Sequence, residues 1–247
     1  MPLRNIEMKI AAIIPARWAS TRFKGKILAK IAGKPMIQHV WEKVRKSKAL
    51  SDIVIACDEK KVLKVCQDFG AWAVLTSKKH PSGTDRIAQA AKIVDADVII
   101  NVQGDEPLIH HSVIDQLAAV FKKNKDLNMA TVIKLLEKKE DIDNPNVVKV
   151  VIDRNGFALY FSRSPIPFNR DKEKVNYYKH FGIYGYRKDF LFAFRNLPVS
   201  KLEKAEKLEQ LRVLEAGYKI KTVQTDIETV GVDTKEDLLK VESLLRL

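Results

Sequence analysis

Apolar and polar positions along the first hundred residues predict strands and helices in strict turn. Short apolar runs of strand length occur four times, at 10–14, 53–56, 72–75 and 98–102. Amphipathic segments with helical spacing lie between or just before them, at 35–50, 59–69 and 85–94. This order is typical of a parallel sheet covered by helices on both faces, so we predict a doubly wound α/β body.

The pattern changes in the second half of the chain. We expect a strand at 129–134, and then an antiparallel hairpin over 147–162 that turns at Asn155-Gly156. The remaining expected elements are a strand at 179–187, helices at 188–196 and 201–217, a strand at 219–223 and a helix at 234–246. The sequence therefore predicts a mostly parallel mixed sheet with an inserted antiparallel β lobe.

We interpret 1–247 as a single domain, because its length is near the upper limit for one hydrophobic core. Within it, 8–135 forms the α/β body, about 147–187 forms the lobe, and 188–247 returns to the body.

The first apolar run is followed by an unusually basic loop. Pro15 should end the strand, because proline has no N–H to donate to the ladder. The loop then presents cations and small polar residues within a few positions: Arg17, Ser20, Thr21, Arg22, Lys24, Gly25 and Lys26. Ligands of open α/β sheets bind at the carboxyl ends of strands, where such a loop suits a triphosphate. The alternative is a basic, solvated surface loop; a Walker spacing is absent.

Composition excludes several classes of protein. The net charge of +13 comes from 44 basic and 31 acidic residues that are interleaved along helix faces, so we predict no nucleic-acid partner. No apolar run approaches the roughly 18 residues that span a bilayer, and no signal-peptide core follows Met1. We therefore expect a cytoplasmic protein without membrane insertion. Cys57 and Cys66 lack the spacing of a zinc site and are expected to be buried thiols.

Two aspartates are candidate metal ligands. Asp105 lies in the turn QGDEP directly after a buried strand, and Asp233 lies in GVDTKEDL just before the last helix. Mg²⁺ typically takes one or two carboxylates and completes its shell with water and substrate phosphates. Each aspartate also has a structural interpretation: Asp105 as a helix cap, and Asp233 or Thr234 as the cap of the last helix, with Glu236 in a capping box. Convergence of the pair on one ion would favour the metal site.

Polar residues of the second half form a candidate set for binding a polyol acid. Arg163 could hold a carboxylate, and Glu209 and Gln210 could bind hydroxyls. His180 and Tyr184 lie nearby in the segment KHFGIYGYR. Taken singly, each of these side chains is more often a surface or packing residue.

Seven segments together resemble one enzyme family. They are PARWASTRFKGK at 15–26, HPSGTDR at 80–86, VQGDEP at 102–107, YFSRSPIPF at 160–168, KHFGIYGYR at 179–187, LEKAEKLEQLRVLEAG at 202–217 and GVDTKEDL at 231–238. The first three resemble cytidylyltransferases in general. With the others, the chain from Met8 onward resembles the 3-deoxy-manno-octulosonate (Kdo) cytidylyltransferases.

The resemblance implies a fold and an activity. It implies the Rossmann-like fold of the nucleotide-diphospho-sugar transferases, a homodimer, and a lobe that serves sugar binding and dimerisation. It further implies transfer of CMP from CTP to the anomeric hydroxyl of Kdo, with Mg²⁺ as cofactor, giving CMP-Kdo for lipopolysaccharide biosynthesis and pyrophosphate.

Site residues carry over by motif. Arg17, Ser20 and Lys26 would hold the triphosphate, and Ser82 and Gly83 would face the cytosine. Asp105 and Asp233 would ligate Mg²⁺ and, with Arg17 and Lys26, form the catalytic set. The sugar-binding set would be Gln103, Arg163, His180, Tyr184, Glu209 and Gln210. The chain departs from the usual STRLPGKPL form: Phe23 replaces leucine, and Lys24 and Ile27 replace two prolines.

The residues leave three alternative functions open. Another sugar acid, such as a sialic acid or an amino-substituted Kdo, would need only a different sugar pocket. A uridylyl- or thymidylyltransferase for hexose phosphates would want a G-x-G-x-R loop, which is missing. A basic nucleic-acid binder would associate with DNA or RNA in a salt-sensitive way.

Overall fold

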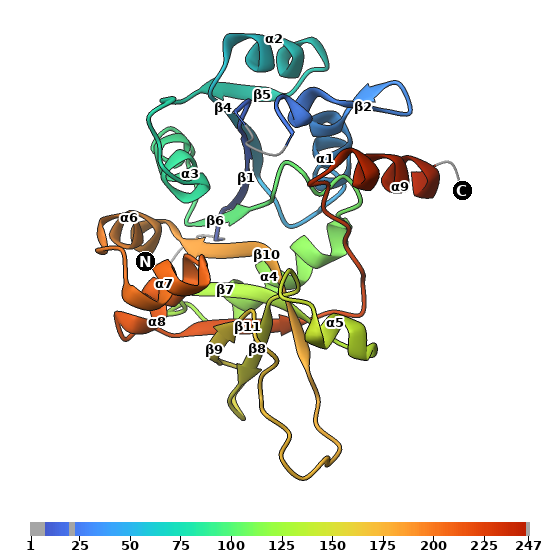
Figure 1. Cartoon of the computed structure of the whole chain (residues 1–247). Coiled ribbons are helices and arrows are strands. Elements are labelled where there is room, and N and C mark those ends of the chain that lie inside the picture. The colour runs from blue at the N-terminus through green and yellow to red at the C-terminus, as the bar shows by residue number, and fades with distance from the viewer. Residues whose placement is uncertain (1–7, 20–22, 246–247) are drawn as a thin grey trace, which may run out of the picture.

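The computed structural model describes residues 8–19 and 23–245. Its central sheet has the strand order β11-β7-β10-β6-β1-β4-β5 (Figure 1). The strands are β1 (Ile10–Ala16), β4 (Asp52–Cys57), β5 (Trp72–Leu75), β6 (Val98–Asn101), β7 (Met129–Leu135), β10 (Tyr178–Arg187) and β11 (Ile220–Gln224). Strand β10 runs antiparallel to β6 and β7, and the other neighbours along this path are parallel. The predicted mostly parallel mixed sheet is confirmed.

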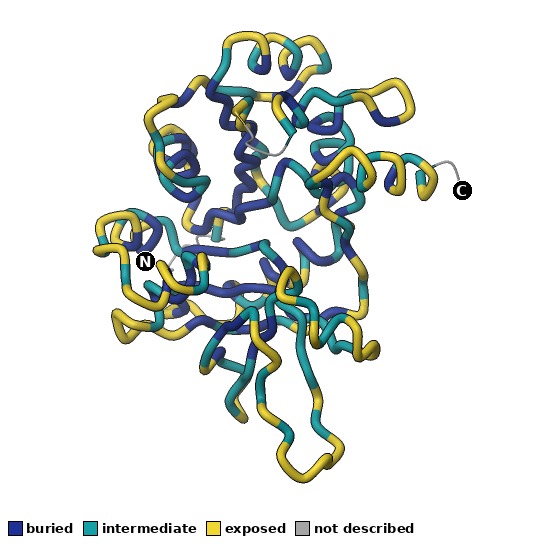
Figure 2. Tube along the Cα trace, viewed as in Figure 1, coloured by how far each residue is buried: buried dark blue, intermediate teal, exposed yellow. Residues whose placement is uncertain are grey.

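Helices cover both faces of this sheet. The helices are α1 (Met36–Val44), α2 (Lys60–Asp68), α3 (Gly83–Ala91), α4 (His111–Lys123), α5 (Lys139–Asp143), α6 (Lys188–Asn196), α7 (Lys201–Glu206), α8 (Gln210–Glu215) and α9 (Lys235–Leu245). One apolar core includes side chains of α1, α2, α4 and α9, and a second includes those of α3, α6 and α8. Alternate residues of β1 enter the two cores, because successive side chains of a strand point to opposite faces. Figure 2 shows the buried strands between the helices.

Smaller elements complete the fold. The hairpin of β8 (Lys149–Ile152) and β9 (Ala158–Ser162) turns at the expected Asn-Gly pair, where Gly156 has φ 71°. Strand β8 also pairs with the start of β10. A short 3₁₀ helix, η1 (Lys26–Leu28), ends the basic loop, and β2 (Lys30–Ile31) and β3 (Lys34–Pro35) form a separate two-stranded sheet. Within the described ranges, no helix is long and apolar enough to cross a membrane.

The expectation that Pro15 ends the first strand is wrong. Strand β1 continues to Ala16, and Pro15 pairs in register with Ala56 of β4. The carbonyl of Ile13 accepts from the N–H of Val102, so Ile13 and Pro15 both direct their backbone groups toward β6. Because β6 makes its last pair opposite Ile13, Pro15 lies beyond it and loses no ladder hydrogen bond.

The expected helix over 201–217 is instead two helices. Helix α7 begins with a capping box between Ser200 and Glu203 and ends where Lys207 adopts a left-handed conformation (φ 56°, ψ 45°). The chain restarts as α8 three residues later. Arg212 of α8 spans the break, because its guanidinium lies 2.5 Å from Glu203. The break directs the segment between the two helices toward the cavity described below.

Candidate active site

Three connecting segments meet at one edge of the sheet. They are the basic loop after β1, the turn 102–107 after β6, and the connection from β11 to α9. The N–H of Val232 donates to the carbonyl of Asp105 at 2.8 Å, which ties the third segment to the second. The edge formed in this way lies at the carboxyl ends of β1 and β6, where open α/β sheets bind ligands.

The side chain of Lys26 joins the two candidate metal ligands. Its Nζ lies 2.6 Å from Asp105 Oδ2 and 3.1 Å from Asp233 Oδ1, and it donates to the carbonyl of Val232 at 2.9 Å. Partial burial disfavours the charge on Lys26, but the two carboxylates outweigh it and raise the pKa of the ammonium group. The structure therefore brings both aspartates to a single cationic group.

Other residues make the caps of the two helices that follow these aspartates. Helix α4 begins after His110, whose ring accepts the N–H of Ser112, so Asp105 stays in its turn. At the start of α9, the carboxylate of Asp237 accepts the N–H of Thr234 at 2.9 Å, in the place expected of Glu236. Thr234 Oγ1 in turn accepts the N–H of Asp237 at 3.2 Å, so the expected cap is made by Thr234, while an Asp233 carboxylate oxygen lies at Lys26.

A glycine allows the turn to approach the strand. A Cβ on Gly104 would lie 2.7 Å from the carbonyl oxygen of Pro15 and 2.8 Å from Ile27 Cδ1, closer than such atoms pack. A larger residue would move Asp105, which follows directly, away from Lys26.

The donor atoms at this edge suit Mg²⁺. Two carboxylates and the carbonyl of Val232 already surround one cationic group, and all are hard oxygen ligands. Among residues 8–19 and 23–245, no group of three or more His, Cys, Asp and Glu is placed to hold a metal. Two carboxylates that leave positions for water and phosphate are the pattern expected of a Mg²⁺–nucleotide site.

The two ends of the basic loop are held together. The N–H of Gly25 donates to the carbonyl of Trp18 at 3.0 Å, and the Lys61 ammonium lies 3.0 Å from the centre of the Trp18 ring. Gly25 has φ 75°, and the Trp18 ring occupies the space that a Cβ would need. Arg17 is exposed at the end of β1. Ser20 lies outside the described residues.

A buried ion pair supports this loop, and sequence reasoning missed it. The carboxylate of Asp58 accepts the N–H of Trp18 at 2.8 Å through one oxygen and faces Arg86 at 3.4 Å through the other. The Arg86 side chain is 1% exposed and donates to Thr76 Oγ1 at 2.5 Å. Burial lowers the pKa of Arg86, which Asp58 opposes. A carboxylate directly after a buried strand was the available signal for Asp58.

The segment HPSGTDR opens helix α3 beside a cavity. Ser82 caps the helix, because its Oγ accepts the N–H of Asp85 at 3.2 Å. Gly83 and Thr84 line the cavity, and no atom lies within 4 Å of a Cβ built on Gly83. This open position leaves room for a flat ring beside Gly83.

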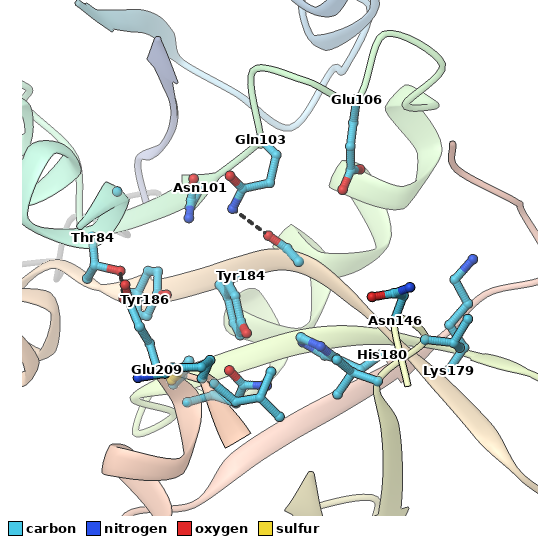
Figure 3. A pocket seen from close by; sticks show the side chains of 18 of the residues that line it. Thr84, Asn101, Gln103, Glu106, Asn146, Lys179, His180, Tyr184, Tyr186 and Glu209 are labelled. Carbon is cyan, nitrogen blue, oxygen red and sulfur yellow. Dashed lines mark hydrogen bonds between the residues drawn. The ribbon is translucent and has the colours of Figure 1, made fainter. Parts of the chain in front are cut away.

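The cavity measures about 550 Å³ and gathers most of the predicted sugar-binding residues (Figure 3). Its lining includes Gln103, His180, Tyr184, Glu209 and Gln210, and it reaches Asp233 of the metal-ligand pair. Gln103 donates to the carbonyl of Gly182 at 2.9 Å, so that its amide is fixed across the cavity.

Burial shifts the pKa values of three groups that line the cavity. It lowers the pKa of His180 to about 3, and the ring nitrogen Nε2 lies 3.0 Å from Thr131 Oγ1. It raises the pKa of the Tyr184 phenol. It also raises the pKa of Glu209, although the Thr84 hydroxyl, which donates to Oε2 at 2.6 Å, opposes this. Burial therefore disfavours the charged form of each of these three groups.

Three buried polar atoms of the cavity have no hydrogen-bond partner in the described structure. They are Asn101 Oδ1, Glu106 Oε2 and Gln210 Nε2, and all three residues line the cavity. Burial, together with the neighbouring Asp105, raises the pKa of Glu106 to about 7. Unpartnered buried groups cost free energy, so their gathering here indicates a site that a polar ligand completes. Asn101 was missed in the sequence, where it is the single polar end of an apolar strand.

Arg163 does not reach this cavity. Its Nε donates to the carbonyl of Glu206 at 2.8 Å, and its Nη1 donates to the carbonyl of Pro145 at 3.0 Å. It is absent from the cavity lining. In this structure Arg163 fastens the end of β9 to α7, outside the lining of the cavity in which it was expected to bind the sugar carboxylate.

Known proteins of one family match nearly the whole length of this chain. Residues 11–220 match the family model described as cytidylyltransferase. A 3-deoxy-manno-octulosonate cytidylyltransferase of Geotalea daltonii is 49% identical over 250 residues, covering 97% of this chain and 99% of the relative. The relative of the same name from Geobacter metallireducens is 50% identical over 245 residues, covering 95% and 96%.

Solved structures give the same result. A structure of CMP:2-keto-3-deoxy-manno-octonic acid synthetase complexed with CTP has a TM-score of 0.93 and 42% identity, covering 96% of this chain and 98% of that one. An inositol-1-phosphate CTP transferase of T. maritima has a TM-score of 0.70 at 16% identity, which shows a shared fold. On sequence, fold and site together, this chain belongs to the 3-deoxy-manno-octulosonate cytidylyltransferase family.

Proposed function

We propose that this chain transfers CMP from CTP to the anomeric hydroxyl of Kdo. The hydroxyl oxygen gives up its proton to solvent and attacks the α-phosphorus, the bond from that phosphorus to the β-phosphate oxygen breaks, and pyrophosphate leaves. The observation that carries the proposal is the placement of the Lys26–Asp105–Asp233 cluster next to a polar cavity that shares Asp233. CTP is a cytoplasmic nucleotide, so we place the reaction in the cytoplasm.

The edge of the sheet that carries Lys26, Asp105 and Asp233, here called the charged edge, would bind the nucleotide. Lys26 and Arg17, with Ser20, would contact the triphosphate and stabilise charge on the departing pyrophosphate. Ser82 and Gly83 would face the cytosine, where the open space beside Gly83 supports the assignment. The catalytic contribution of these residues is positioning and charge neutralisation, because phosphoryl transfer leaves little covalent chemistry to the protein.

Asp105 and Asp233 would hold Mg²⁺. Bound there, the ion would supply positive charge that lowers the pKa of the attacking hydroxyl and offsets the repulsion between two anions. The two carboxylates themselves already converge on Lys26, whose ammonium marks a place for positive charge.

The cavity would bind the sugar acid. Gln103, His180, Tyr184, Glu209 and Gln210 present amide, imidazole, phenol and carboxyl groups to one space. The unpartnered Nε2 of Gln210 supports this role, since a sugar hydroxyl or carboxylate would supply its missing acceptor.

We further propose that the active form is a homodimer. Leu159 of β9 and Phe168 of the following loop are 61% and 87% exposed, which supports a contact on this projecting part of the chain (Figure 1). Light scattering should give twice the chain mass of 28.1 kDa, and a single-chain mass would contradict the proposal.

The test is pyrophosphate release from CTP with a panel of acceptors. We expect release with Kdo and Mg²⁺, and none when either is omitted. Preference for an amino-substituted Kdo or a sialic acid would change the sugar and keep the chemistry. Release with a hexose phosphate, or salt-sensitive nucleic-acid binding without any release, would overturn the proposal.

A further inference from the structure

Two segments far apart in the sequence touch across the cavity. Thr84 lies in the first turn of α3, directly after Gly83, and Glu209 lies between α7 and α8. The Thr84 hydroxyl donates to Glu209 Oε2 at 2.6 Å (Figure 3). This contact links the segment HPSGTDR to the segment LEQLR.

Thr84 is held by rigid elements. It is 9% exposed in a helix that Ser82 caps, and the neighbouring Asp85 pairs with Arg195 of α6 at 3.1 Å. The Thr84 hydroxyl therefore occupies a fixed point relative to the sheet.

Glu209 has much less support of its own. It follows the left-handed residue Lys207, and its side chain makes no capping bond at the start of α8. Arg212 is the nearby cation, but its guanidinium is engaged by Glu203 at 2.7 and 2.5 Å. In the part of the chain that the structure describes, the hydrogen bond from Thr84 thus ties the Glu209 carboxylate to the body of the molecule.

We infer that Thr84 is a positioning residue for the sugar acid: it fixes one oxygen of Glu209 so that the other, Oε1, accepts a hydroxyl of the sugar. The inference rests on the proposed function. Thr84 also adjoins Gly83, which we place beside the cytosine, so the same turn of α3 supports both the nucleotide and its acceptor.

The test compares side chains of matched shape at position 84. Thr84→Val keeps the volume and removes the hydroxyl, and Thr84→Ser keeps the hydroxyl. A lost hydrogen bond to a carboxylate should raise the KM for Kdo in Thr84→Val by about tenfold or more, with the KM for CTP changed by less than about threefold. Thr84→Ser should stay within about threefold of the wild type. If Thr84→Val does not fold, Thr84→Ala serves, with the same expectation.

A double-mutant cycle separates positioning from a general structural effect. Once Glu209→Gln is present, adding Thr84→Val should raise the KM for Kdo by less than about twofold further, because the two residues act together. The matched control is Thr222→Val, since Thr222 is 8% exposed and donates to the carbonyl of Gly156 at 2.9 Å away from the cavity. Its KM values should match those of the wild type.

The outcomes are distinguishable. An active wild type with an unchanged KM for Kdo in Thr84→Val, or additive effects in the cycle, would overturn this inference alone. A wild type that releases no pyrophosphate from CTP and Kdo would overturn the proposed function, and the inference with it.

Discussion

The charged edge and the cavity differ in how their polar groups are paired in the absence of ligand. At the edge, Lys26 lies between Asp105 and Asp233, so opposite charges compensate one another before any ligand arrives. In the cavity, burial keeps His180 neutral, and atoms such as Gln210 Nε2 have no partner in the described structure. A ligand at the edge must therefore replace ion pairs that already exist there. A ligand in the cavity instead supplies hydrogen bonds that the cavity atoms lack.

The largest effect should come from removing charge at the edge. Asp105→Asn or Asp233→Asn should cost at least about 3 kcal/mol of transition-state stabilisation, the scale of one preorganised electrostatic contact. The measurement is kcat for pyrophosphate release at saturating Mg²⁺. Asp68→Asn is the matched control, because Asp68 is exposed and pairs only loosely with Lys64 at 3.7 Å. Near-normal turnover of either site variant would remove that aspartate from the site.

The half-buried His180 should make the stability of the fold sensitive to acid. Burial lowers its pKa from 6.5 to about 3, so the unfolded chain takes up a proton that the folded chain does not. This contribution to stability is complete above pH 6.5 and is lost as the pH falls toward 3, by about 2 kcal/mol at pH 5. Urea unfolding should show that the free energy of unfolding falls less between pH 7 and pH 5 in His180→Gln than in the wild type.

The raised pKa of Glu106 changes stability in the opposite direction. Burial makes its charged form unfavourable, so its contribution to the free energy of unfolding falls as the pH rises from 4.5 to about 7. The comparison therefore uses the difference in the free energy of unfolding between His180→Gln and the wild type at each pH. If the free energy of unfolding had the same pH dependence in the two proteins, His180 would not be neutral in the folded chain.

Filling the space at Gly104 should disturb the edge and spare the cavity. Gly104→Ala places a methyl group against the carbonyl of Pro15 and the side chain of Ile27, at a cost of about 2 kcal/mol in stability. Because the turn must shift, kcat should fall further than the KM for Kdo rises. Thermal unfolding and steady-state kinetics of the same preparation check this, and an unchanged kcat would show that Asp105 does not need the close approach.

An apolar replacement in the cavity should separate binding from stability. Gln210→Leu removes an unpartnered buried nitrogen, so the free energy of unfolding without ligand should stay equal or rise. The KM for Kdo should nevertheless rise by about tenfold, and the KM for CTP should not change. An unchanged KM for Kdo would mean that Gln210 does not contact the sugar.

The smallest effect on catalysis is expected at Arg163. Arg163→Ala removes hydrogen bonds to the carbonyls of Glu206 and Pro145, so stability should fall by about 1 kcal/mol. The KM for Kdo should change by less than about threefold. A large, selective rise in that KM would return Arg163 to the sugar-binding set.

Sequence reasoning predicted the charged edge well, because local rules govern it. Apolar runs end in polar turns at the carboxyl ends of β1 and β6, and this places the basic loop beside Asp105 without knowledge of distant contacts. The same rule failed at Pro15, where the absence of a ladder partner depends on where β6 ends.

The cavity was harder to predict because its geometry depends on long-range packing. The break between α7 and α8 depends on the conformation of Lys207, and residues that favour a continuous helix surround it. Whether Arg163 faces the cavity or the carbonyl of Glu206 is decided by the placement of the hairpin, which spacing does not encode. Asn101 became recognisable only when its buried oxygen proved to lack a partner.

The most direct test follows the α-phosphate. CTP labelled at that position should convert, with Kdo and Mg²⁺ present, into labelled CMP-Kdo and an equal amount of unlabelled pyrophosphate. The reaction should stop in Asp233→Asn, which alters the residue shared by the edge and the cavity. Label that stays in CTP, or that appears as free CMP whether or not Kdo is present, would contradict the account.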